Sequence, residues 1–169
     1  MAGKKNKKKV PSGQPSDHRG IAENRRARHQ YELLETLECG IVLVGTEVKS
    51  LRAGNCSMAE AFAQILDKDG QLELVLKGLH IPEYAFGNKM NHKPTRDRRL
   101  LAHAREIRAW YKKVREKGVT IVPLEVYFKG SRVKVALALA RGKKLYDKRV
   151  AEREKSDRRE VQREMARRR

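Results

Sequence analysis

The last 29 residues of the chain constrain its fold most, because they cannot form part of a packed core. Residues 141–169 hold thirteen Lys or Arg and six Asp or Glu, a net charge of +7, and their only aromatic residue is Tyr146. Such a segment buries too little apolar surface to offset the entropy lost on ordering. Its Ala, Glu, Arg and Gln content still favours helix, with i,i+4 pairs such as Glu154 and Arg158. We predict a basic tail over 141–169, disordered when free and helical when bound to a negative partner.

The charge of the whole chain points to the same kind of partner. Lys and Arg make up 40 of 169 residues, the net charge is +19 and the pI is about 10.3. Such an excess of positive charge favours binding to a phosphate backbone, through counterion release and electrostatic steering. No apolar stretch approaches the roughly 20 residues of a spanning helix, and no apolar run follows the N-terminal lysines, so we expect a cytoplasmic protein that binds no membrane.

The chain divides into one domain and two basic ends. Residues 1–20 are rich in Lys, Gly, Ser and Pro and are expected to form a disordered basic arm. Order is expected to begin near residues 24–29, within a single RNA-binding β-barrel domain over 21–140. Cys39 and Cys56 have neither CxxC spacing nor a neighbouring pair of His residues, so we expect two reduced thiols.

The first half of the domain is expected to consist of strands and one short helix. Strands are predicted over 31–37 and 41–44, joined by a turn at 38–40, and the second continues through 45–51. Ser57 and Glu60 form a capping box that predicts a short helix extending to Ile65. A tight turn at 67–70 then leads into an alternating strand over 72–81.

The second half contains the one long helix and a closing hairpin. Thr95 is the expected N-cap of a helix over 95–117, which Gly118 ends. Strands over 120–129 and 132–140 are joined at Gly130 and Ser131. The fold class is therefore mainly β: an oligonucleotide-binding-fold-like antiparallel barrel with flanking helices. A split β-α-β sheet is the competing topology.

The chain carries no pattern typical of an enzyme. The five histidines are scattered, and neither HExxH, GxxxxGK[ST] nor GxGxxG occurs. We expect no enzyme, no cofactor and no metal site. Two clusters of cations favour RNA binding instead: Arg25, Arg26 and Arg28 before the first strand, and Lys93, Arg96, Arg98 and Arg99 around the start of the long helix.

Four sequence motifs, in this order, resemble those of the SsrA-binding protein family, also called small protein B. They are NRRARHQY at 24–31, GTEVKSLRAG at 45–54, PTRDRRLL at 94–101 and ARGKKLYDKR at 140–149. The resemblance runs from about residue 21 to 169. It implies a binding protein that carries the tRNA-like part of transfer-messenger RNA to ribosomes stalled on messages without a stop codon. It also implies a tail that becomes helical in the empty decoding site and mRNA channel.

The resemblance to the family supports only some of the predicted site residues directly. Glu38 matches an acidic residue associated with RNA binding, and Leu101 and His103 match a stretch with the same association. The RNA-binding set is thus predicted as Arg25, Arg26, Arg28, Glu38, Lys49, Arg52, Arg98, Arg99, Leu101 and His103. The tail set for the ribosomal decoding site is Gly142, Lys143, Lys144, Tyr146, Asp147, Lys148 and Arg149. The chain departs from the family at residues 55–58, Ala102 and Ala104.

Two questions stay open on the residues. Glu38 either accepts hydrogen bonds from base amino groups or orients neighbouring Arg side chains. The chain is either the transfer-messenger RNA partner, expected as a monomer that also binds the ribosome, or a generic basic ribosomal or tRNA-binding module. A nuclease is a third, weaker hypothesis.

Overall fold

The computed structural model describes residues 18–87, 91–116, 118–143 and 165, and the structural statements below concern these residues. Its strands are β1 (His18–Glu23), β2 (Tyr31–Ile41), β3 (Phe62–Lys68), β4 (Gln71–Lys77), β5 (Arg98–Leu101), β6 (Val119–Lys129) and β7 (Arg132–Gly142). Its helices are α1 (Ala27–Gln30), α2 (Gly45–Arg52) and α3 (Ala104–Val114). None of these helices has the length and apolar character needed to cross a membrane.

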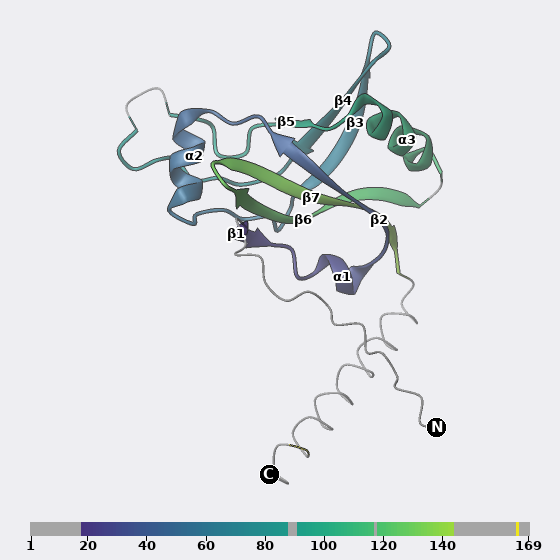
Figure 1. Ribbon diagram of the computed structural model, residues 1–169, viewed down its shortest axis with the longest axis horizontal. Helices are drawn as coiled ribbons and strands as arrows, with labels where there is room; N and C mark the ends of the chain where they lie inside the picture. Colours follow the sequence, from purple (N-terminus) through teal and green to yellow (C-terminus); the bar gives the residue numbers. More distant parts are fainter. Residues whose placement is uncertain (1–17, 88–90, 117, 144–164, 166–169) are drawn as a thin grey trace, which may run out of the picture.

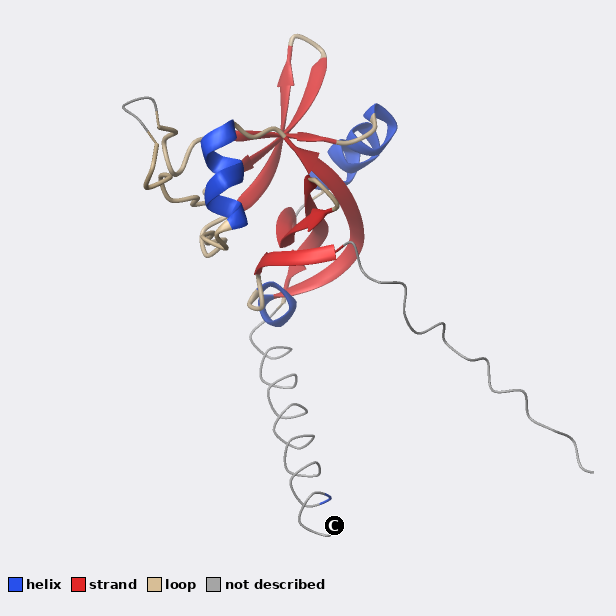
Figure 2. Cartoon of the chain, turned by 60° about the vertical axis from the view of Figure 1, so that its left-hand side comes forward, coloured by secondary structure: helices blue, strands red, loops and turns tan. Residues whose placement is uncertain are grey.

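The strands form a closed antiparallel barrel. Their order is β1-β6-β3-β4-β5-β2-β7, and a further pairing of β6 with β7 closes the ring. The long strands β2, β6 and β7 wrap around it, and irregular register within β2 and β6 marks where they bend. The helices lie outside the barrel at three separate places (Figures 1 and 2). The predicted mainly-β barrel with flanking helices is confirmed, and the closed ring rules out the split β-α-β sheet.

Inward-facing aliphatic side chains fill the barrel. Alternation along β7 directs Val133, Val135, Leu137 and Leu139 into the main core, as the sequence pattern predicts. A smaller cluster of Ala27, Val122 and Ala140 lies beneath α1. The hairpin between β6 and β7 turns at Gly130, where φ is +59°, and the predicted turn before β4 has φ of +52° at Asp69 and +82° at Gly70.

Residues 45–52 form helix α2, so the predicted strand over 45–51 was wrong. The Glu47 carboxylate accepts the Val44 N–H at 2.9 Å, which satisfies an orphan donor in the first turn. The same carboxylate is buried and accepts hydrogen bonds from Arg96 and Arg98, at 2.9 and 2.8 Å. Arg96 and Arg98, about fifty residues away in the sequence, therefore stabilise this helix. The local β-propensity of residues 41–44 does not indicate these contacts.

The capping box at 57–60 does not start a helix, so this prediction was also wrong. Ser57 forms an isolated bridge with His80 in which each backbone N–H donates to the other residue's carbonyl, at 2.9 and 3.0 Å. Ala63 and Ile65 on β3 are buried while Phe62 and Gln64 between them are exposed. This period-two alternation outweighs the cap signal.

The predicted long helix over 95–117 is shorter and begins later. Residues 98–101 form strand β5, in which Arg98 and Leu100 are buried and Arg99 and Leu101 are exposed. His103, not Thr95, precedes the first turn of α3, with extended backbone (φ −67°, ψ 140°) and an N–H that donates to Glu106 at 2.9 Å. The helix ends at Val114 rather than at residue 117.

Three predicted boundaries also move. Residues 38–40 lie inside β2, paired with β7, and do not form a turn. Strand β1 begins at His18, so residues 18–20 belong to the barrel rather than to the N-terminal arm, whose residues 1–17 lie outside the described part. Strand β7 extends to Gly142, so Arg141 and Gly142 belong to the barrel as well.

Candidate nucleic-acid interface

The arginines before β2 lie on helix α1 and on the turn that precedes it. Arg25, Arg26 and Arg28 are all exposed, while Ala27 between them is buried against β6 and β7. The Asn24 carboxamide oxygen accepts the Ala27 N–H at 3.1 Å, and the Asn24 N–H donates to the Leu124 carbonyl at 2.8 Å. The arginines are thereby fixed to the barrel and face solvent. We call these three residues the α1 cluster.

Lys143 closes the C-terminal end of α1. Its backbone N–H donates to the Gln30 carbonyl at 3.0 Å, and its Nζ donates to the Arg28 carbonyl at 3.2 Å. A cation at orphan carbonyls of a helix end is favourable. Gly142 pairs with Tyr31 in the β2–β7 ladder. Two residues of the predicted tail set are therefore part of the barrel and α1, whereas Lys144, Tyr146, Asp147, Lys148 and Arg149 lie outside the described residues.

Glu38 lies at the centre of a polar cluster on the outer face of β2, β6 and β7. Its carboxylate accepts a short hydrogen bond from the Tyr127 hydroxyl and lies 3.1 Å from Lys129 Nζ and 3.4 Å from Lys134 Nζ. The hydrogen bond from Tyr127, helped by the two lysines, lowers the pKa of Glu38 below its ordinary value. Glu38 is therefore a carboxylate at neutral pH, and it holds two exposed or half-exposed ammonium groups in place.

Glu38 and Leu101 share one face of the barrel, although they are 63 positions apart. Leu101 pairs with Gly40 across β2 and β5, and Glu38 lies two residues from Gly40 on the same side of the strand. A Cβ at position 40 would meet the Leu101 Cβ at 3.3 Å, so the glycine permits this close approach. Lys134 pairs with Gly40 from the other side, and Arg99 points outward with Leu101. We call Glu38, Lys134, Arg99 and Leu101 the β2–β5 face.

His103 and the α2 cations extend the surface in different directions. His103 is exposed, two residues beyond Leu101, where α3 begins. Lys49 and Arg52 are exposed on helix α2, and the Lys49 ammonium lies 5.3 Å from the centre of the Tyr84 ring. Figure 1 shows α2 and α3 far apart on the barrel. The predicted RNA-binding residues thus form several patches around the barrel, not one.

Arg98 is buried, unlike the other predicted RNA-binding arginines. Its side chain is 0% exposed, its Nε donates to Glu47 at 2.8 Å, and its Nη1 donates to the Leu79 carbonyl. Burial raises the pKa of Glu47, but hydrogen bonds from Arg96 and the Val44 N–H and the charge of Arg98 outweigh it and lower that pKa overall. Arg98 therefore supports the fold from inside and does not face a ligand.

Several surface residues next to Glu38 were missed by the sequence analysis. His18 stacks on Tyr127, with ring centroids 4.0 Å apart and planes at 19°, and its Nε2 lies 2.7 Å from the Glu125 carboxylate. Lys129 flanks the same cluster. The only sequence signal was the outward register of 125, 127 and 129, which becomes informative only once β1 and β2 are known to pair beside β6 and β7.

The described residues hold no group of three or more His, Cys, Asp or Glu side chains that could bind a metal ion. Burial raises the pKa of Cys39 to about 12 and that of Cys56 to about 11, so both side chains are neutral thiols at pH 7. The chemistry that this surface offers is charge and hydrogen bonding, with the exposed Leu101 among the cations.

Comparison with known proteins identifies the family. The family model described as SmpB protein matches residues 21–167. The SsrA-binding protein of Acidothermus cellulolyticus is 54% identical over 88% of this chain and 91% of its own length, and that of Mycolicibacterium gilvum is 51% identical over 95% of each. A solved structure described as "tmRNA-SmpB: a journey to the center of the bacterial ribosome" matches with a TM-score of 0.59 and 51% identity, covering 73% of this chain and 85% of that one. The chain therefore belongs to the SmpB family, whose members include these SsrA-binding proteins.

Proposed function

We propose that this protein binds the tRNA-like domain of transfer-messenger RNA and delivers it to stalled ribosomes in the cytoplasm, as a step of trans-translation. The observation that carries the proposal is family membership over residues 21–167, among relatives named for binding SsrA RNA. The likeness to a structure named for tmRNA, SmpB and the bacterial ribosome supports the same partners. The protein contributes binding and positioning and catalyses no reaction.

The barrel surface offers what a structured RNA requires. The α1 cluster and the β2–β5 face lie toward opposite ends of β2, and the seven residue steps from Tyr31 to Glu38 span about 23 Å. Cations at both ends bind phosphates and supply salt-dependent affinity, whereas Leu101 and Glu38 make contacts that depend on RNA shape and bases. An RNA elbow resting along β2 would touch both patches at once.

The C-terminal segment has a separate role in this proposal. Lys144, Tyr146, Asp147, Lys148 and Arg149 enter the decoding site and mRNA channel of a ribosome that lacks downstream message. Folding on entry couples helix formation to an empty channel, because mRNA in the channel would exclude the segment sterically. The protein would thereby select stalled ribosomes over translating ones.

The deciding experiment is to purify the tagged full-length protein from its own host and sequence the RNA that accompanies it. We expect a single predominant RNA of the transfer-messenger type, retained at salt concentrations that remove bulk RNA. Recovery of ribosomal RNA or mixed tRNAs in place of that species would favour the generic basic module and contradict the proposal. RNA cleavage by the pure protein would instead support the nuclease hypothesis.

A further inference from the structure

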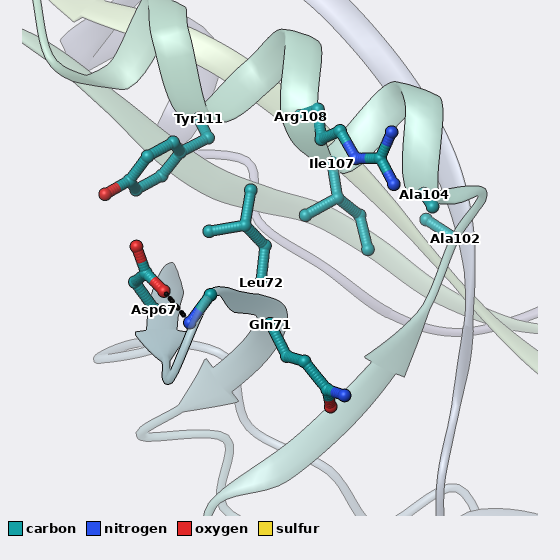
Figure 3. Close-up of a pocket in the computed structure, with 9 residues that line it drawn as sticks. Asp67, Gln71, Leu72, Ala102, Ala104, Ile107, Arg108 and Tyr111 are labelled. Atoms are coloured by element: carbon teal, nitrogen blue, oxygen red, sulfur yellow. Dashed lines mark hydrogen bonds between the residues drawn. The ribbon is translucent and has the colours of Figure 1, made fainter.

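A groove between the β3–β4 hairpin and helix α3 has no place in the function proposed so far. It encloses about 510 Å³, with Asp67 and Gln71 on the hairpin side and Ile107, Arg108 and Tyr111 on the helix side. Figure 3 shows Leu72 and Ile107 between these two walls, with the Tyr111 ring at one end and Gln71 toward the other. Ile107 and Trp110 of α3 are buried, so the helix wall of the groove is fixed to the core.

The groove continues onto the β2–β5 face. A second cavity of about 180 Å³ shares Gln71, Leu72 and Ile107 with the first and is lined further by Arg99 and Leu101. Leu101 is 49% exposed at this junction. A ligand lying on the β2–β5 face therefore has an uninterrupted path from Leu101 to Tyr111.

The lining suits a nucleobase better than a phosphate. Leucine and isoleucine side chains offer no hydrogen bond to a phosphate, whereas both of them and the tyrosine ring pack against the flat apolar face of a base. The rim provides hydrogen-bonding groups that a base edge needs: the Gln71 carboxamide and the Asp67 carboxylate, whose Oδ1 accepts the Gly70 N–H at 3.1 Å. Arg108 on the helix wall forms no ion pair with any described residue and is available for the adjoining phosphate.

We propose that this groove is a binding site for one unpaired nucleotide of the bound RNA. The base packs over Leu72 and Ile107 beside Tyr111, its edge meets Gln71 and Asp67, and Arg108 contacts the phosphate. This inference rests on the proposed function and deepens it, because it requires that the RNA present a splayed-out base rather than only its backbone. Exposed Arg105 on the same helix makes its surroundings favourable to a polyanion.

The experiment uses the full-length protein and the tRNA-like fragment of transfer-messenger RNA, and it compares Tyr111→Leu and Gln71→Ala with Lys112→Ala, whose side chain does not line the groove. We expect each groove variant to weaken RNA binding about tenfold, with the slope of log K against log salt unchanged, because a stacked base releases no counterions. Lys112→Ala should change affinity at most twofold. Placing 2-aminopurine at each unpaired position in turn should reveal one site whose fluorescence changes on binding to the wild type and not to Tyr111→Leu.

Three outcomes overturn the inference. Wild-type affinity in both groove variants would remove the groove from the interface, and a slope reduced by about 0.7–0.9 would mean that a phosphate contact had been lost instead. Unchanged affinity for the tRNA-like RNA with weakened ribosome binding would assign the groove to the ribosome instead. Asp67→Asn, which keeps the bond to Gly70, gives a second variant if Tyr111→Leu lowers the melting temperature. Failure of the wild type itself to prefer this RNA would contradict the proposed function, which keeps the two failures distinct.

Discussion

At the scale of single residues, the contacts of Glu38 explain how an acid fits into a surface that is proposed to bind a polyanion. Its carboxylate already accepts the Tyr127 hydroxyl and lies within 3.4 Å of both Lys129 Nζ and Lys134 Nζ. These contacts favour the second of the two roles open at the sequence level, in which Glu38 orients cations. The cations are lysines from β6 and β7 rather than arginines.

Glu38→Gln should therefore weaken RNA binding, although it removes a negative charge. We expect a several-fold loss in the wild-type background and almost no further loss once Lys129 and Lys134 are both alanine, because the carboxylate acts through them. Fluorescence anisotropy at fixed salt measures this double-mutant cycle. Glu32→Gln, an exposed acid on the same strand, is the matched control and should leave affinity equal or slightly higher. Additive losses would mean that Glu38 contacts RNA directly.

Glu47 should make stability fall in acid. Its pKa in the folded state is below its ordinary value, so the unfolded chain takes up the proton first as pH falls. The stabilisation that the Glu47 carboxylate gives is complete above its pKa in the unfolded chain, about 4.3, and is lost as the pH drops through its pKa in the folded state. Glu47→Gln should lower the free energy of unfolding at pH 7 by about 3 kcal/mol, because Arg98 stays buried without a countercharge.

Urea titrations at pH 7 and at pH 4 measure this effect. The loss caused by Glu47→Gln should shrink at the lower pH, where the wild type has begun to lose the same interaction. Glu73→Gln removes an exposed partner of Lys68 and should leave the midpoint nearly unchanged. A loss in Glu47→Gln that is the same at both pH values would contradict the assignment.

At the scale of elements, predictability followed the range of the interactions. The β6–β7 hairpin and the start of β4 were predicted well because alternation, Gly130 and the turn at Asp69 and Gly70 encode them locally. The predicted strand over 72–81 is too long, because β4 ends at Lys77. Helix α2 could not be predicted, since Arg96 and Arg98, about fifty residues further along the chain, bind its Glu47. Strand β5 was hidden inside a helical pattern because Arg98 occupies a buried position that charge alone would place at the surface.

Lys143 should contribute to RNA binding in two ways, by its positive charge and by holding α1 in position. Lys143→Met removes the ammonium from the Arg28 carbonyl, whereas Arg141→Met removes an equal charge from an exposed neighbour on β7. We expect Lys143→Met to reduce RNA affinity several-fold more than Arg141→Met and to speed hydrogen exchange at the His29 and Gln30 amides. Equal effects of the two changes, with exchange in α1 unaltered, would show that only the charge counts.

At the scale of the whole molecule, the barrel explains why the predicted site was only partly assembled from sequence. Residue types and the resemblance selected Glu38, Leu101, His103 and the α1 cluster, but not how they are arranged. Closure of the ring sets Leu101 opposite Gly40 and so beside Glu38, while it buries Arg98 on the inward side of the same strand. Which side of a short strand faces solvent depends on its pairing, and no spacing in the chain specifies that.

Truncation of the C-terminal segment should separate the two proposed functions, RNA binding by the barrel and peptide tagging on stalled ribosomes. A chain ending at Lys143 keeps the complete β2–β7 ladder and the contacts to α1, so its affinity for the tRNA-like RNA should stay within a few-fold of the full-length value. Peptide tagging on stalled ribosomes should be abolished, because residues 144–169 are missing. Binding assays and an in vitro tagging reaction measure the two effects. Parallel loss of both activities would reduce the segment to an affinity arm.

The antiparallel pairing of β2 with β7 also has a mechanical consequence. The C-terminal end of β7 lies beside the N-terminal end of β2. A pulling force on the chain beyond Lys143, with α1 held by RNA, therefore acts on the β2–β7 residue pairs one after another. The contacts of Lys143 with Gln30 and Arg28 would break first, followed by Gly142 with Tyr31. Each released residue lengthens the connection by about 3.4 Å. Tension between RNA and ribosome would thus be relieved by peeling at this edge while the barrel stays closed.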